Sequence, residues 1–174
     1  MLAQLILRIL PSARLRCRLR QNAFVRGIIR LLFGGERSVP VPHSPYRLYV
    51  DGSRNLGFMA HGFSGCEQEE RALVSRIVSR LQPMTIWDIG ANIGFWSIFL
   101  STLVPRCSIR CYEPDPLNQK YLLLNRDRNG IGNWTVRPVV LSDRKGTSSF
   151  VTDVTTGSTG RIALGKTFGG DIQV

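Results

Sequence analysis

The residues most suited to chemistry lie in a seven-residue segment that joins an apolar run to a helical pattern. Asp88 comes first, Gly90 follows two residues later, Asn92 stands in the middle and Gly94 closes the segment. Glycine allows a tight turn and lets a ligand approach the backbone without meeting a Cβ. The N–H groups that open the following helix favour a carboxylate or a phosphate in the adjoining cleft. The segment therefore predicts a binding site at a strand-to-helix turn.

A second acidic residue is placed to complete this site. Glu113 ends the next predicted strand, 23 positions after Gly90 (113 − 90 = 23). In doubly wound folds a carboxylate at this place accepts hydrogen bonds from two neighbouring hydroxyls of an unphosphorylated ribose. Glu113 is therefore the strongest single candidate for binding a nucleoside.

The spacing of the glycines distinguishes between nucleotide ligands. A dinucleotide fingerprint needs GxGxxG, but Asn92 occupies the place of its middle glycine. Pyrophosphate binding is therefore disfavoured, and no GxxxxGK[ST] phosphate loop is present. Asp88 suits a ligand with a cationic ammonium group, such as the methionine end of S-adenosylmethionine. An NAD-dependent oxidoreductase stays open as an alternative.

The surrounding elements predict an α/β fold. Short apolar strands at 85–89, 108–112 and 134–141 alternate with helical patterns, which is typical of a parallel sheet with crossover helices. Trp96, Phe99, Leu100 and Leu103 have helical spacing and should pack on the sheet. Asp115 caps a further helix with Pro116 in its first position, and Asn129-Gly130 ends it.

Two more elements are expected before this sheet, and one after it. Residues 46–50 followed by Asp51-Gly52 indicate a strand and a turn, the first arm of a hairpin. A helix should cover about 66–82, with Leu73, Ile77 and Leu81 in one apolar stripe beside Val74 and Val78. Residues 146–152 would form another hairpin arm.

At this point the chain resembles a known family. The runs WDIGANIGFWSIFL, CYEPDP, LNRDRNG and VVLSDRKGTSSF occur in this order and are similar to motifs of FkbM-type S-adenosylmethionine-dependent methyltransferases. The resemblance covers about residues 58 to 170. It implies a Rossmann-like class I methyltransferase fold that uses S-adenosyl-L-methionine, and O-methylation of a hydroxyl on a sugar, lipid or secondary metabolite.

The resemblance also assigns residues to parts of the cofactor. It implies that Asp88, Gly90, Asn92 and Gly94 surround the methionine moiety and that Glu113 binds the ribose. Ser142 and Asp143 would lie near the adenine. Family members continue into a segment resembling KxDxEGxE, whereas this chain stops at Val174. We therefore expect residues 46–174 to be the incomplete N-terminal part of a methyltransferase domain, a fragment with weak binding and little or no turnover.

Residues 1–45 are expected to form a separate basic arm and a proline-rich linker. The first 37 residues carry eight arginines against one acid, Glu36, and those from 12 to 33 mix them with apolar residues as in amphipathic helices. Such an arm suits a membrane surface. It would otherwise pack on the protein with its arginines solvated. A truncated, non-catalytic remnant whose arm binds membrane or nucleic acid is a further alternative, although no specific nucleic-acid partner is expected.

The remaining composition gives mainly exclusions. Cys17, Cys66, Cys107 and Cys111 form no CxxC pair or Cys/His cluster, so neither a metal site nor a disulfide framework is expected. The apolar segment 1–10 is shorter than the roughly 20 residues of a membrane span, and its cations follow it, unlike those of a secretory signal. A cytoplasmic protein is expected. His61 is more plausible as a structural residue than as a base, and the catalytic base is unassigned.

Overall fold

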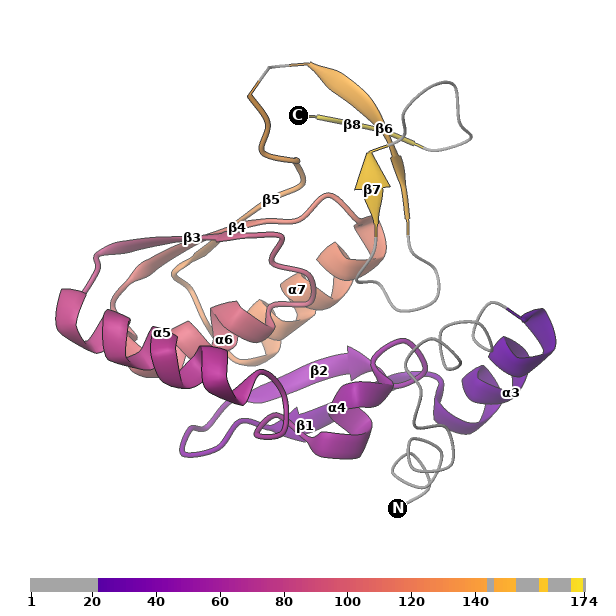
Figure 1. The fold of residues 1–174 in the computed structure, drawn as a ribbon, viewed down its shortest axis with the longest axis horizontal. Helices are drawn as coiled ribbons and strands as arrows, with labels where there is room; N and C mark the ends of the chain where they lie inside the picture. The colour runs from indigo at the N-terminus through magenta and orange to yellow at the C-terminus, as the bar shows by residue number, and fades with distance from the viewer. Residues whose placement is uncertain (1–21, 144–145, 153–159, 163–169, 174) are drawn as a thin grey trace.

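The computed structural model describes residues 22–143, 146–152, 160–162 and 170–173 (Figure 1). Much of the predicted basic arm therefore lies outside the described residues. In chain order the elements are α3 (Ala23–Phe33), β1 (Glu36–Pro40), β2 (Arg47–Asp51), α4 (Leu56–His61), α5 (Gln68–Leu81), β3 (Thr85–Ile89), α6 (Phe95–Leu103), β4 (Ser108–Tyr112), α7 (Pro116–Arg128), β5 (Trp134–Arg137), β6 (Thr147–Val151), β7 (Arg161–Ile162) and β8 (Gly170–Gln173).

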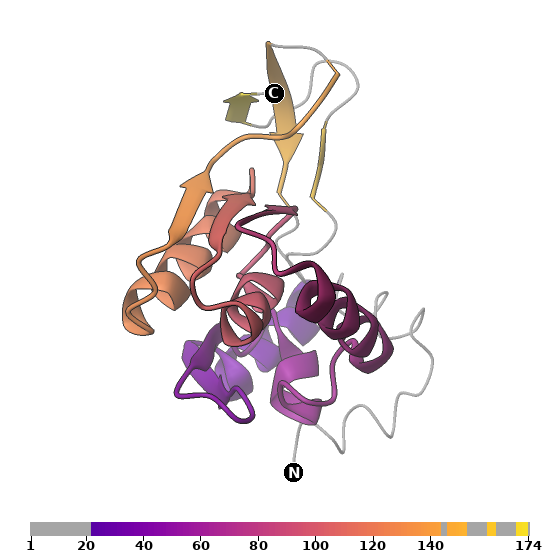
Figure 2. The ribbon, with the colours of Figure 1, turned by 90° about the vertical axis from the view of Figure 1, so that its left-hand side faces the viewer.

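The centre of the fold is a parallel sheet with strand order β3-β4-β5. Helix α6 joins β3 to β4, and α7 joins β4 to β5, and both helices lie on the same side of the sheet (Figures 1 and 2). The predicted α/β fold with crossover helices is confirmed. Strand β5 ends at Arg137 instead of residue 141. Pro138 follows, and a proline has no N–H to continue a ladder.

The two faces of the parallel sheet differ in their covering. Ile109 and Cys111 are fully buried on the side of the helices. Trp87 and Ile89, which alternate with the inward residues of β3, are exposed on the other side. There the guanidinium of Arg110 lies 5.9 Å from the centre of the Trp87 ring. Among the described elements, the helices therefore cover one face.

Helix α6 approaches the sheet through small residues. Ser97 and Ser101 are buried, and the Ser101 hydroxyl accepts a hydrogen bond from Trp134 Nε1 at 2.9 Å. Trp96 and Phe99, which helical spacing assigned to the sheet, are only half-buried and stack edge to face at 5.8 Å. The helix was predicted correctly, but its sheet-facing side is not centred on these aromatic rings.

Strands β1 and β2 form an antiparallel hairpin in which Val39 pairs with Leu48. The predicted strand at 46–50 is present as β2, but it is the second arm and not the first. The hairpin crosses the division placed at residue 45, because the first arm comes from the segment assigned to the arm and linker. Val39, Leu48 and Val50 are buried in the core, so this part of the chain packs against the α/β unit.

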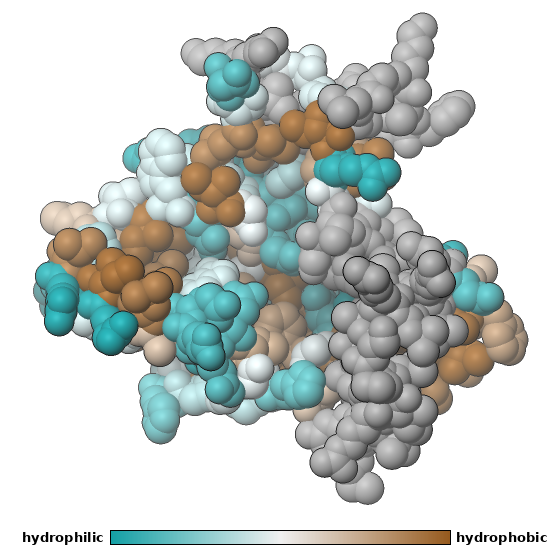
Figure 3. Space-filling model, in the orientation of Figure 1, coloured by the Kyte–Doolittle hydropathy of each residue, from teal (hydrophilic) through white to brown (hydrophobic). Residues whose placement is uncertain are grey.

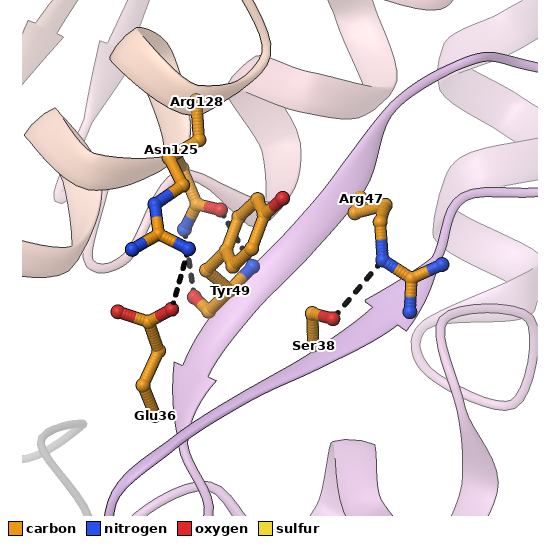
Figure 4. Close-up of polar contacts among 6 residues, drawn as sticks. All are labelled: Glu36, Ser38, Arg47, Tyr49, Asn125 and Arg128. Carbon is orange, nitrogen blue, oxygen red and sulfur yellow. Dashed lines mark hydrogen bonds and ion pairs between the residues drawn. The ribbon is translucent and has the colours of Figure 1, made fainter.

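Asn125 of α7 joins the hairpin to the rest of the fold (Figure 4). Its Oδ1 accepts a hydrogen bond from Tyr49 N at 2.6 Å, and its Nδ2 donates to Tyr49 O at 2.8 Å. The same Nδ2 donates to Ile93 O in the β3–α6 loop at 2.7 Å. Asn125 is fully buried, so no water can replace these bonds.

Exposed contacts flank this buried asparagine. Arg128 forms an ion pair with Glu36 at 2.8 Å, and its guanidinium lies 5.2 Å from the centre of the Tyr49 ring (Figure 4). Arg47 Nε donates to Ser38 Oγ at 3.0 Å. Exposed ion pairs contribute little, about 0 to 1 kcal/mol, so Asn125 and the apolar core hold the hairpin in place.

Helix α5 confirms the predicted helix at 66–82, but its apolar stripe is divided. Val78 is buried and Val74 packs against the core. Leu73, Ile77 and Leu81 are exposed instead, and Figure 3 shows hydrophobic residues over α5 at the left of the molecule. None of the helices in the described ranges is long and apolar enough to cross a membrane.

The last described strands form a separate antiparallel sheet with order β7-β6-β8. Strand β6 at 147–151 confirms the predicted hairpin arm at 146–152. The helix predicted after Asp115 is also confirmed, because Asp115 accepts from Leu117 N at 2.8 Å and Pro116 opens α7.

Replacing Asn125 with alanine should destabilise the fold strongly. Asn125→Ala leaves buried backbone groups at Tyr49 and Ile93 without partners, so we expect the free energy of unfolding to fall by about 3 kcal/mol or more. Urea denaturation measures this change. Asn129→Ala is the matched control, because Asn129 makes the same paired contacts with the backbone of exposed Arg47. An equal loss in both variants would contradict the role of Asn125.

Candidate functional site

The β3–α6 loop is tied to the end of the neighbouring strand. The N–H groups of Gly90 and Ala91 both donate to Tyr112 O, at 2.9 and 3.0 Å. Asn92 N donates to Glu113 Oε2 at 2.8 Å. Asn92 adopts a left-handed conformation with φ of 51°, which turns its N–H toward the carboxylate. The predicted pairing of a glycine-bearing turn with an acid on the next strand is therefore present.

The two glycines of this loop have different surroundings. Both have positive φ, 76° for Gly90 and 90° for Gly94. A Cβ on Gly90 would meet no atom within 4 Å, whereas a Cβ on Gly94 would lie 2.9 Å from Leu122 Cδ1 and 3.2 Å from Trp134 Cζ3. Gly90 leaves open space at the site, and Gly94 allows α7 and β5 to pack closely.

Glu113 is buried, with 5% of its surface exposed, and points toward the loop. Besides Asn92 N, its carboxylate accepts from Asp115 N at 2.9 Å and from Asn118 Nδ2 at 3.4 Å. Burial raises the pKa of Glu113, and these hydrogen bonds partly offset the rise. A carboxylate offers about four acceptor positions, so the three donors leave space for about one more. The sequence predicts that Glu113 accepts from two ribose hydroxyls, which is about one more than its remaining acceptor positions allow.

A cavity of about 330 Å³ lies against Glu113. One wall consists of the turns that follow β3 and β4 and of the start of α7, and it contains Gly90 and the polar residues Asn92, Glu113, Asp115 and Asn118. The facing wall is mostly apolar and consists of Val139, Val140, Leu141, Phe150, Gly160, Arg161 and Ile162. Ile89, Tyr112 and Pro114 complete the lining. The volume lies at the lower end of the range of small-molecule sites.

Asp115 is a candidate binding residue that sequence reasoning assigned only to capping α7. It is 1% exposed and lines the cavity, and its Oδ1 serves the helix cap. Its Oδ2 is buried without a hydrogen-bond partner in the described part of the chain. Buried acceptors are normally paired. No donor in the described residues meets this buried oxygen, and the only sequence signal for Asp115 was its proximity to Glu113.

Asp88 is not among the residues that line the cavity, although Ile89 and Gly90 are. Its Oδ2 accepts from Ser97 Oγ at 2.5 Å, in the first turn of α6. Burial raises the pKa of Asp88, and bonds from the Ser97 side chain and backbone partly offset this. Ser97 Oγ also lies 3.2 Å from Cys111 Sγ, whose pKa burial raises to about 12, so that thiol stays neutral. Asp88 thus binds the first turn of α6, and its contact with an ammonium group stays a prediction.

Four other candidate residues also lie outside the cavity lining: Gly94, Ser142, Asp143 and His61. Ser142 and Asp143 are exposed, and Ser142 Oγ donates to Asp143 at 3.1 Å. The segment before them, 139–141, lines the cavity instead. His61 ends α4 and is exposed. Among the described residues no group of three or more His, Cys, Asp or Glu side chains is arranged to hold a metal ion.

The two loop glycines should respond differently to alanine. Gly94→Ala adds backbone strain and a clash with Leu122, and we expect it to lower the free energy of unfolding by about 3 kcal/mol or more. Gly90→Ala adds backbone strain without a clash, so it should lower the free energy of unfolding by only about 1 to 2 kcal/mol. Urea denaturation of both variants tests this order. A larger loss for Gly90→Ala would show that the loop is packed differently.

The capping role of Asp88 predicts a pH dependence of stability. Because its pKa is raised in the folded chain, this group contributes stability that declines as the pH rises from the ordinary carboxyl range through the raised pKa. Asp88→Asn keeps an acceptor for Ser97 but does not titrate, so it should remove this part of the dependence of stability on pH. Asp88→Ala removes the same pH-dependent contribution together with the hydrogen bond to Ser97, so it should cost about 1 to 2 kcal/mol at low pH and less as the pH rises. Thermal unfolding from pH 4 upward measures both, and an unchanged slope in Asp88→Asn would refute the assignment.

Comparisons with known proteins give partial structural likenesses. No family model and no curated protein matches the chain. TYW2 of Pyrococcus horikoshii in complex with MeSAdo is 13% identical, with a TM-score of 0.46, over 78% of this chain and 53% of that one. TYW2 of M. jannaschii in complex with AdoMet is 15% identical, with a TM-score of 0.44, over 63% of this chain and 44% of that one. A precorrin-6y C5,15-methyltransferase of Geobacter metallireducens is 33% identical, with a TM-score of 0.35, over 41% of this chain and 38% of that one. The chain thus spans between 38% and 53% of the length of these structures.

Proposed function

We propose that this chain binds the adenosyl end of S-adenosylmethionine and forms part of a methyltransferase. The observation that carries the proposal is the 2.8 Å hydrogen bond from Asn92 N to Glu113, because it holds a buried carboxylate beside a glycine-bearing turn. The motif resemblance to FkbM-type methyltransferases supports the same ligand from the sequence.

The residues present fit an adenosyl group in three respects. Gly90 leaves the space above the turn free of a Cβ. The remaining acceptor position of Glu113, which lines the cavity, suits one ribose hydroxyl. The apolar wall at 139–141 offers a surface for the flat base. Together these groups would hold and orient the nucleoside.

The same loop disfavours a dinucleotide. A pyrophosphate on α6 would need free N–H groups at the turn. Four of the five backbone N–H groups from Gly90 to Gly94 already donate within the protein. The carboxylate of Asp88 also lies at the start of α6, where it would repel a phosphate. The oxidoreductase alternative therefore has weaker support.

When bound, S-adenosylmethionine supplies an electrophilic methyl group. The role of the described residues would be to fix the nucleoside, since most of the rate in such a reaction comes from holding the reactants in line. From the FkbM resemblance we propose a hydroxyl of a sugar, lipid or secondary metabolite as the acceptor. A base for that hydroxyl is not assigned among the cavity residues.

Calorimetry with S-adenosylhomocysteine tests this proposal. Glu113→Ala should weaken binding about tenfold or more, because a hydrogen bond to a charged acceptor contributes about 1.5 to 3 kcal/mol and 1.4 kcal/mol corresponds to tenfold. Glu113 also supports the loop, so its loss could weaken binding by disturbing the fold. Leu141→Arg is therefore the second variant, because it narrows the cavity from the opposite wall at an exposed position. We expect the same loss from it.

Glu69→Ala is the matched control, because this exposed acid on α5 lies outside the cavity lining and should leave the affinity unchanged. Equal binding by wild type and both cavity variants would reject the assignment. A rise in melting temperature with NADH but not with S-adenosylhomocysteine would favour the oxidoreductase. Binding without transfer to any hydroxyl acceptor would leave a non-catalytic binding module.

A further inference from the structure

Helix α3 presents an apolar stripe to the exterior. None of its residues is buried, and Phe24 and Leu31 are 76% and 85% exposed. Ile28 and Leu32 are also exposed, and positions 24, 28, 31 and 32 share one side of a helix. Figure 3 shows hydrophobic residues at the lower right, where α3 lies in Figure 1. The half-buried residues Val25, Ile29 and Phe33 lie on another side of α3, so the contacts of the helix with the protein leave this stripe uncovered.

The helix that carries the stripe is well formed at both ends. Asn22 Oδ1 accepts from Phe24 N at 2.9 Å and from Val25 N at 3.3 Å, and Gly34 N donates to Arg30 O at 2.8 Å. Gly52 N then donates to Gly35 O at 3.1 Å, which attaches the end of the helix to the hairpin. The exposed side chains therefore have a fixed direction, on an element distant from the parallel sheet (Figure 1).

The charge of this region complements an anionic surface. Arg26 and Arg30 lie one helical turn apart on the side opposite the stripe. The first 37 residues carry eight arginines against the single acid Glu36, a net charge of +7 (8 − 1). An apolar face opposite a cationic face is the pattern of helices that lie in a membrane interface. Arginines near an anionic leaflet add attraction.

We propose that α3 binds the surface of an anionic lipid bilayer, with Phe24, Ile28, Leu31 and Leu32 inserted at the headgroup boundary and the arginines toward the headgroups. A nucleic acid would use the arginines but would leave the aliphatic stripe exposed, so the bilayer accounts for more of the surface. This inference does not depend on the proposed cofactor and is tested without it.

Vesicle co-sedimentation of the full chain tests the proposal. Vesicles of phosphatidylcholine and phosphatidylserine at about 2:1 should bind the wild type, and pure phosphatidylcholine should bind it much less. The double variant Phe24→Ser with Leu31→Ser should lower partition to the anionic vesicles about tenfold or more, because it removes most of the insertable apolar area. Raised salt should weaken the wild-type interaction.

Leu73→Ser with Ile77→Ser is the matched control, since it removes a similar exposed stripe on α5 and should bind vesicles like the wild type. Both pairs are exposed, and unchanged melting curves would show that the fold is retained. Equal loss in both double variants, or undiminished binding by the α3 variant, would overturn the proposal. Binding to duplex DNA but not to either vesicle would overturn it in favour of nucleic acid.

Discussion

The carboxylate of Glu113 joins three segments at the carboxyl ends of β3 and β4. It accepts from Asn92 in the β3–α6 loop, from Asp115 in the β4–α7 turn and from Asn118 in α7. Because a buried backbone N–H without a partner is costly, these turns need an acceptor at this place. The group that we propose to bind a ribose is therefore also the group that organises the site, and its raised pKa reflects the desolvation that this position imposes.

The loop above the cavity is also held from the opposite side. Asn125 donates to Ile93 O within the loop while it pairs with Tyr49 of the hairpin. The hairpin, α7 and the loop consequently form one connected polar network through the core. This explains why a hairpin that contributes no side chain to the cavity lining still belongs to the structural support of the site.

Elements with local signals were predictable, and features set by distant partners were not. The cap at Asp115 and the left-handed Gly130 marked the ends of α7, and the position of Glu113 followed from strand order. The hydrogen bond between Asp88 and Ser97 was not predicted, although strand alternation places Asp88 with the helix-facing residues of β3. Strand β1 was missed because Val39 is its one buried residue, so no periodic pattern marks it. The burial of α5 likewise depends on which elements pack against it.

The two walls of the cavity differ in how the rest of the fold holds them in place. The polar wall consists of turns whose N–H groups are committed to Tyr112 and Glu113, so a change there alters strand pairing as well as binding. The apolar wall at 139–141 and 160–162 follows a proline break and belongs to short, peripheral segments. A change of side chain along the second wall leaves these hydrogen bonds intact and therefore costs folding little. Under the proposed function, that wall is where ligand preference can change without loss of the fold.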